Sequence, residues 1–186
     1  MKLKRPPYPE VVGTAGYFFV HADHRETAID HAIRVIRDDA ARELAACGDD
    51  PVMAALTAPM GDWVVESLIQ GAWLREYHEW EKATKSYFEG QHVRNGSLEP
   101  DWKAKLPGSA GAVSHVDRVR AQLAYFSASV AGAVLDTLNA QRRLINAAKH
   151  KDEYFVTEQD YRALIQAVAD FWNELAPQEE FTVRRG

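Results

Sequence analysis

Residues 114–150 read SHVDRVRAQLAYFSASVAGAVLDTLNAQRRLINAAKH, and this stretch decides the fold class. Its apolar residues recur at steps of three and four, the period of one face of an α-helix. Ser114 and Asp117 have the spacing of a capping box, in which each side chain satisfies an amide of the first turn. The pattern predicts one long helix from Ser114 to about His150. The small residues 127–129 and Gly132 mark the place where this helix can bend or break.

The same helical period recurs in four further segments, which are residues 9–24, 26–47, 62–88 and 157–175. In the first of them the period fits a helical turn or a short strand, and we favour a helix. Asp62 is expected to be the N-cap of the third segment, and Thr157 with Asp160 repeats the capping box at the last. The glycines and prolines of residues 89–111 predict a long mobile loop, and residues 176–186 are expected to form a loosely held tail.

Length and composition fit a single bundle of these helices. The 186 residues are 46% hydrophobic and 26% charged, with a mean hydropathy of -0.37, and such a chain can bury one core. We therefore expect one helical domain over residues 1–186, all-α, built as an up-and-down bundle of four to five helices. The sequence leaves the structure of residues 1–24 open.

Cysteine usage and the N-terminal sequence indicate the compartment. Cys47 is the only cysteine, which excludes a disulfide framework and fits a reducing environment. The apolar run at residues 17–20 is too short for a signal peptide or a membrane span. We expect a cytoplasmic protein with no membrane segment.

The charge distribution limits how the chain can meet nucleic acid. A formal net charge of -5 excludes a protein that coats nucleic acid over its whole surface, because such proteins carry a large positive excess. Residues 101–150 nevertheless hold seven basic and three acidic residues, a net +4, while the segments on both sides are acidic. One local basic surface is therefore compatible with the sequence.

A line of polar residues runs along the predicted long helix beside its apolar stripe. Its members, at steps of three and four, are Asp136, Asn139, Arg143, Asn146 and His150. At 100° per residue Arg143 and His150 differ in direction by about 20°, whereas Arg142 and His150 differ by about 80°. Arg143 is therefore the arginine expected to act together with His150.

An arginine and a histidine on one helical face suit metal-free cleavage of a phosphodiester. The guanidinium supplies a fixed positive charge for the phosphate oxygens, and the imidazole exchanges a proton near neutral pH. In RNA the 2′-hydroxyl is the attacking group. The other interpretation is solvated charge, because Lys149, His150 and Lys151 lie near a helix C-terminus, where cations are favoured by the helix dipole.

The run from Arg143 to His150, RLINAAKH, resembles the signature of the HEPN domain superfamily, an arginine and a histidine separated by four to six residues. The short link and the capped helix that follow resemble the same context. The resemblance implies a four- or five-helix bundle that pairs as a homodimer. It also implies a metal-independent ribonuclease, common in toxin–antitoxin and phage-defence systems, with an antitoxin or another defence protein as partner. Other HEPN domains are non-catalytic dimerisation or nucleotide-binding modules.

Carried over to this chain, the resemblance gives Arg143 the role of stabilising the phosphorane and His150 that of general acid or base. Asn146 would orient the substrate, and Arg142, Lys149 and Asn139 are expected to bind RNA. No cofactor and no metal are expected. Two positions depart from the pattern: the residue after the arginine, often polar in active members, is Leu144, and the second residue after the histidine, a tyrosine that some antitoxins modify, is Asp152.

Three other groups of residues compete with this site. His21, Asp23, His24 and His31 form a group whose imidazoles and carboxylate could bind zinc or nickel, although such histidines are mostly surface residues. The aromatic residues between 63 and 88 could stack bases, but core packing is favoured for those on the apolar stripe, Trp73, Tyr77 and Trp80. Glu76 or Glu79 could face the polar line and pair with Arg143, and otherwise both would be solvated. Phosphate loops, nucleophile elbows and Cys/His zinc spacings are absent from the sequence.

Overall fold

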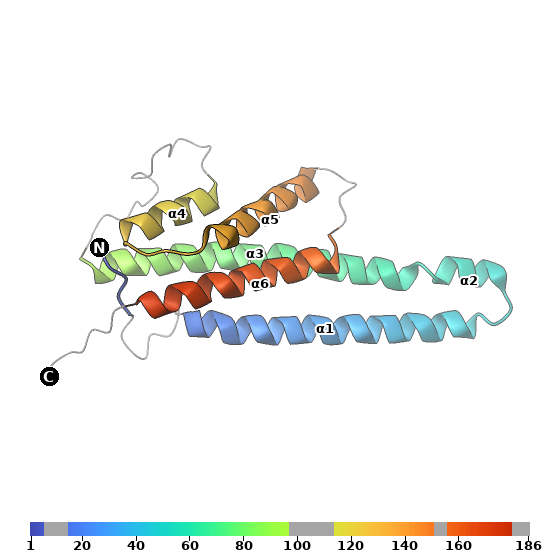
Figure 1. Ribbon diagram of the computed structural model, residues 1–186. Coiled ribbons are helices and arrows are strands. Elements are labelled where there is room, and N and C mark those ends of the chain that lie inside the picture. The colour runs from blue at the N-terminus through green and yellow to red at the C-terminus, as the bar shows by residue number, and fades with distance from the viewer. Residues whose placement is uncertain (6–14, 97–113, 151–155, 180–186) are drawn as a thin grey trace.

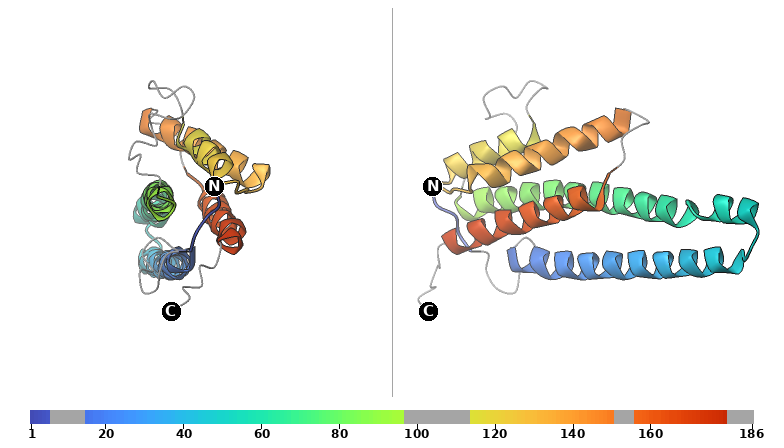
Figure 2. Two further views of the ribbon diagram at one scale, coloured as in Figure 1. Left: turned by 90° about the vertical axis from the view of Figure 1, so that its left-hand side faces the viewer. Right: turned by 45° about the vertical axis from the view of Figure 1, so that its right-hand side comes forward.

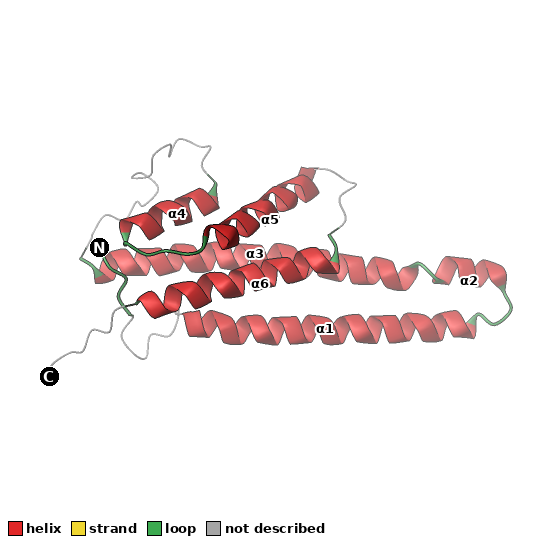
Figure 3. Cartoon of the chain, in the orientation of Figure 1, coloured by secondary structure: helices red, strands yellow, loops and turns green. Residues whose placement is uncertain are grey.

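The helical pattern of the sequence is realised throughout the computed structural model, which describes residues 1–5, 15–96, 114–150 and 156–179. The side chains of residues 15–23, 149 and 150 are outside this description. Within it the chain forms helices and no β-strand, which confirms the all-α prediction (Figure 3). In chain order the elements are α1 (Ala15–Ala46), α2 (Pro51–Thr57), α3 (Met60–Arg94), α4 (His115–Tyr125), α5 (Gly132–His150), α6 (Glu158–Leu175) and a 3-10 turn, η1 (Ala176–Gln178).

The long helices α1 and α3 lie side by side and run in opposite directions (Figure 1). We predicted two helices, residues 9–24 and 26–47, where the structure has the single helix α1, and residues 9–14 lie outside the described part. Gly61 allows the two helices to approach, because a Cβ atom there would lie 2.5 Å from the Cβ of Ala40. Gly48, at φ 55°, ends the helical pattern as expected for a glycine after a helix C-terminus.

Helix α3 is longer than predicted at both ends. Its N-cap is Pro59, not Asp62, which lies in the first turn, where its charge favours the helix N-terminus. At the other end the helix continues to Arg94, so part of the predicted loop at residues 89–111 is helical, and residues 97–113 lie outside the described part. The N-terminal residues pack here: Lys4 N–H donates to Gln91 Oε1 and Gln91 Nε2 donates to Lys4 O, each at 2.8 Å.

The predicted helix 114–150 is two helices, α4 and α5, separated at the small residues where a break was expected. Helix α4 ends in a Schellman motif, in which Ala128 N–H donates to Leu123 O at 2.9 Å and Ser127 N–H to Ala124 O at 3.1 Å. The motif needs a left-handed residue, and Ser127 takes that conformation with φ 51°. At the start of α4 one bond of the predicted capping box is present, since Ser114 Oγ accepts from the Asp117 amide. The Asp117 carboxylate accepts from the Ser114 hydroxyl and not from the Ser114 amide.

Helix α6 begins and ends where the sequence predicted. Both bonds of the Thr157–Asp160 capping box are present, and α6 stops at Leu175, before Pro177. The expected loose tail is wrong for residues 176–179. Gln178 exchanges two hydrogen bonds with the backbone of Ser129, and Glu179 accepts one from Tyr87 at 2.8 Å. Residues 180–186 lie outside the described part.

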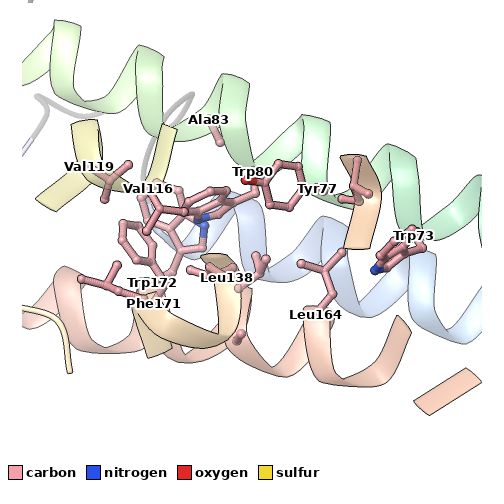
Figure 4. Close-up of a cluster of buried hydrophobic side chains, with 14 of the residues drawn as sticks. Trp73, Tyr77, Trp80, Ala83, Val116, Val119, Leu138, Leu164, Phe171 and Trp172 are labelled. Carbon is pink, nitrogen blue, oxygen red and sulfur yellow. The ribbon is translucent and has the colours of Figure 1, made fainter. Parts of the chain in front are cut away.

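A core of aromatic and aliphatic side chains joins α1, α3, α4, α5 and α6, and Figure 4 shows part of it. Trp80 of α3 packs edge-on against Phe171 of α6, with ring centroids 5.6 Å apart. Leu138 of α5 and Leu164 of α6 belong to the same core and are fully buried. Seen from the end, α4 and α5 form a layer over α3 and α6, and α1 lies on the opposite side (Figure 2).

One end of the molecule projects beyond the bundle as an arm, which we define as residues 38–66. Arg37 pairs with Glu158, the first residue of α6, at 3.4 Å, so the residues of α1 after Arg37 extend past the end of that helix. The arm contains the C-terminal turns of α1, all of α2 and the first turns of α3 (Figures 1 and 2). None of the residues of α2 is buried.

Candidate functional site

The candidate site lies on the outer face of α5. Its inner face is buried through Leu135, Leu138 and Ile145, which fixes the rotation of the helix about its axis. The predicted polar line therefore faces outward: Asp136, Arg143 and Asn146 are exposed and Asn139 is half-buried. His150 is the last residue of the same helix, and its side chain and that of Lys149 lie outside the described part.

Arg143 and Arg142 have different surroundings. Arg142 is half-buried, and its Nε donates to Asn139 Oδ1 at 3.1 Å. Arg143 is exposed, and in the described part of the chain no carboxylate or carbonyl oxygen is bonded to it. An exposed guanidinium can offer its donors to an incoming anion such as a phosphate. The roles expected for the two arginines stay predictions.

The expectation that Glu76 or Glu79 pairs with Arg143 is wrong. Glu76 is buried between α3 and α1, where Arg25 donates to both of its oxygens, at 2.7 and 2.6 Å. Glu79 forms an exposed pair with Lys82 at 3.4 Å on the same helix. Neither carboxylate neutralises the outer face of α5.

The aromatic residues on the apolar stripe of α3 are core residues, as favoured by the sequence, whereas Trp63 is 61% exposed. Trp73, Tyr77 and Trp80 are at most 2% exposed, so none of them offers a face to a base. Trp73 joins α3 to α5, which we call the motif helix because it carries Arg143 and His150. The Nε1 of Trp73 donates to the buried Gln141 Oε1 at 2.7 Å. Burial raises the pKa of Tyr77, and its hydroxyl has no hydrogen-bond partner among the described residues.

A cavity of about 450 Å³ opens beside the Arg25–Glu76 pair, between α1 and α3. Its walls include the apolar side chains of Ile29 and Leu68, and Tyr161 of α6 closes one side. Burial, together with the nearby Glu76, raises the pKa of Tyr161 to about 12, so its hydroxyl keeps its proton. We did not predict this cavity, since it depends on the approach of helices far apart in the sequence.

The described residues contain no cluster of three or more histidine, cysteine or acidic side chains suited to a metal ion. The proposed ligands His21 and Asp23 have side chains outside the described part, and His24 is exposed. The histidine cluster therefore stays a prediction.

Comparison with family models, with characterised proteins and with solved structures found no match to this chain. Any functional conclusion depends on the residues and their arrangement.

Proposed function

We propose that this protein is a metal-independent, HEPN-like endoribonuclease whose site is formed by Arg143, Asn146 and His150 on α5. One observation carries the proposal: Arg143 and Asn146 lie on the solvent-exposed face of a helix whose last residue is His150. The seven-residue step from Arg143 to His150 is two helical turns, about 10 Å along the axis. The proposal assigns one phosphate and its ribose to this step of the helix.

The reaction is an in-line attack of the RNA 2′-oxygen on the adjacent phosphorus. A bond forms between that oxygen and phosphorus, the bond from phosphorus to the 5′-oxygen breaks, and the products are a 2′,3′-cyclic phosphate and a 5′-hydroxyl. His150 removes the proton of the 2′-hydroxyl or returns one to the leaving oxygen. Arg143 stabilises the negative charge on the phosphorane, and Asn146 orients the strand.

Both proton transfers need a group, and one chain supplies a single motif histidine. We therefore propose a homodimer in which two copies of α5 approach across a two-fold axis and each contributes an imidazole. Pairing would also bring together two segments of net +4, residues 101–150, and concentrate positive potential in one groove. Arg142, Lys149 and Asn139 would bind the RNA strand on either side.

The proposed setting is a cytoplasmic toxin–antitoxin or phage-defence system, in which a partner protein restrains the nuclease. The alternative is a HEPN-like module that dimerises without turnover. The two differ in one observable, the appearance of cyclic phosphate ends.

The test is cleavage of a labelled RNA by the purified full-length protein in EDTA, with the ends of the products identified. Cleavage with cyclic phosphate ends is expected, and His150→Ala should abolish it. The matched control is His78→Ala, which removes an exposed histidine from α3. Cleavage that persists undiminished in His150→Ala would overturn the assignment, whereas a dimer that never cleaves RNA would favour the silent module.

A further inference from the structure

The arm presents an apolar stripe that no described residue covers. Large apolar side chains recur along α2 and the first turns of α3 at helical steps, and each is half or more exposed: Val52 66%, Met53 50%, Leu56 62%, Met60 50%, Trp63 61% and Val64 50%. In soluble monomers large apolar side chains are normally exposed one by one, and contiguous apolar patches mark interaction sites.

The stripe has the register of a helix–helix seam. Met53, Leu56, Met60 and Trp63 follow at steps of three, four and three, the spacing of the a and d positions of a heptad. The backbone permits one continuous face, since Ala58 and Pro59 keep right-handed helical dihedral angles between α2 and α3. From Val52 to Val64 the stripe is about 18 Å long, so it matches a partner helix of about three turns.

The charges around the stripe select the partner. The arm carries seven carboxylates and one basic residue, Arg42, and all eight side chains are exposed; the acidic ones are Asp38, Asp39, Glu43, Asp49, Asp50, Asp62 and Glu66. This net charge of −6 disfavours the arm of a second copy, because two such arms repel each other. It disfavours RNA and anionic lipid for the same reason.

A membrane is the other apolar occupant to consider. The stretch Pro51–Arg94 is long and apolar enough to cross a membrane, and only 22% of its 18-residue apolar segment is buried. Helices that lie in a membrane interface carry lysine and arginine on their polar face, whereas this arm carries carboxylates. Exposed methionines among carboxylates instead suit a basic amphipathic helix, because methionine side chains adapt to different apolar partners.

We propose that the arm is a docking site for a partner protein, which contributes an amphipathic helix with apolar residues on one face and lysine or arginine on its flanks. The apolar face covers the stripe from Val52 to Val64, and the basic flanks pair with carboxylates such as Asp62 and Glu66. The site is separate from Arg143 on α5 and does not depend on ribonuclease activity.

The test uses full-length protein and four fluorescein-labelled synthetic helices of 14 residues. The first has leucine at its a and d positions and lysine at its e and g positions. The second has glutamate in place of lysine, the third serine in place of leucine, and the fourth is the first in scrambled order. Fluorescence anisotropy should give a micromolar Kd for the first and at least tenfold weaker binding for the other three.

Variants locate the site. Leu56→Ser with Met60→Ser should weaken binding of the first helix at least tenfold, while Val93→Ser, which alters a 71% exposed valine at the other end of α3, should leave the Kd unchanged. Asp62→Lys with Glu66→Lys should reverse the preference towards the glutamate helix. Circular dichroism melts check that each variant is folded, which is expected because every altered side chain is exposed.

Three results would overturn the proposal. One is equal binding of the leucine helices with lysine and with glutamate, or no binding of either. The second is a dimer, measured by sedimentation, that Leu56→Ser with Met60→Ser dissociates, because the occupant would then be a second copy. The third is co-sedimentation with phosphatidylcholine or phosphatidylglycerol vesicles that the same double variant abolishes, because the occupant would then be a lipid surface.

Discussion

Arg25 of α1 binds Glu76 of α3 through two hydrogen bonds, Nε to Oε2 at 2.7 Å and Nη2 to Oε1 at 2.6 Å. The carboxylate side chain is only 5% exposed, while that of the arginine is 30% exposed. The pair connects the two longest helices at the edge of the cavity that they share. Because both oxygens of Glu76 accept from Arg25, this carboxylate does not pair with Arg143 on α5.

Removing one partner of this pair should be more harmful than removing both. Arg25→Ala leaves a buried carboxylate without its counter-charge and should lower the free energy of unfolding by roughly 3–5 kcal/mol. Arg25→Met with Glu76→Met removes both charges, and urea denaturation should show a clearly smaller loss. A double variant as unstable as Arg25→Ala would contradict this explanation.

The free energy of unfolding should decrease at acidic pH because His115 is buried in its neutral form. Burial, with a contribution from the nearby Arg118, lowers the pKa of His115 from 6.5 to about 4. Between these values the unfolded chain binds a proton that the folded chain does not, so stability decreases as the pH falls from 6.5 to 4. His115→Gln, beside Thr84, removes this titration. Its unfolding free energy should depend less on pH than that of the wild type, by roughly 1–3 kcal/mol over this window in urea denaturation. Parallel pH profiles would count against the assignment.

Tyr77→Phe should keep or raise stability, by up to about 1 kcal/mol, because it deletes a buried hydroxyl that has no partner among the described residues. The control is Tyr87→Phe, which deletes the donor to Glu179 and should lower stability by about 1–2 kcal/mol. Thermal unfolding of the two variants compares them directly. A destabilised Tyr77→Phe would indicate that the hydroxyl has a partner.

Replacing each of the two arginines of α5 by alanine should have a different effect on RNA cleavage. Arg143→Ala removes an exposed side chain, so the unfolding free energy should change by less than about 0.5 kcal/mol while RNA cleavage is lost. Arg142→Ala removes the bond to Asn139 and should weaken RNA binding, and it should retain cleavage at saturating RNA. Single-turnover rates and filter binding distinguish the two effects. Equal loss of cleavage in both variants would contradict the assigned roles.

Replacing Ser127 by glycine should stabilise the protein. A non-glycine residue pays a steric cost at φ 51°, so Ser127→Gly should raise the unfolding free energy by about 0.5–1 kcal/mol. Ser127→Val, with a branched side chain at the same φ, should lower it. Urea denaturation of both variants gives the two signs, and a destabilising glycine would refute the strain argument.

Local patterns in the sequence predicted local structure well. The capping box at Thr157 and the stop before Pro177 gave α6 correctly, because capping depends on residues within one turn. The apolar period likewise placed Arg143 and Asn146 on one outer face. The end of α4 was harder, since the Schellman motif there contains Ser127 in the position where glycine is the usual signal.

Contacts between distant segments could not be predicted in the same way. A helical period tells which side of α3 Glu76 occupies, but it does not tell whether α1 or α5 covers that side. The contact of Lys4 with Gln91 has no pattern of its own, because it joins a non-helical N-terminus to a glutamine in a helix. The cavity beside Arg25 could not be predicted for the same reason, because its walls come from helices far apart in the sequence.

The start of the motif helix is held by the last residues of the described chain. Ser129 N–H donates to Gln178 Oε1 at 2.9 Å, and Ala131 N–H donates to Glu174 Oε2 at 2.5 Å. A chain emerging from the ribosome cannot form these bonds until Glu174 and Gln178 have left the exit tunnel. The start of α5 is therefore held in place only after α6 has been made, later than the residues of α5 themselves.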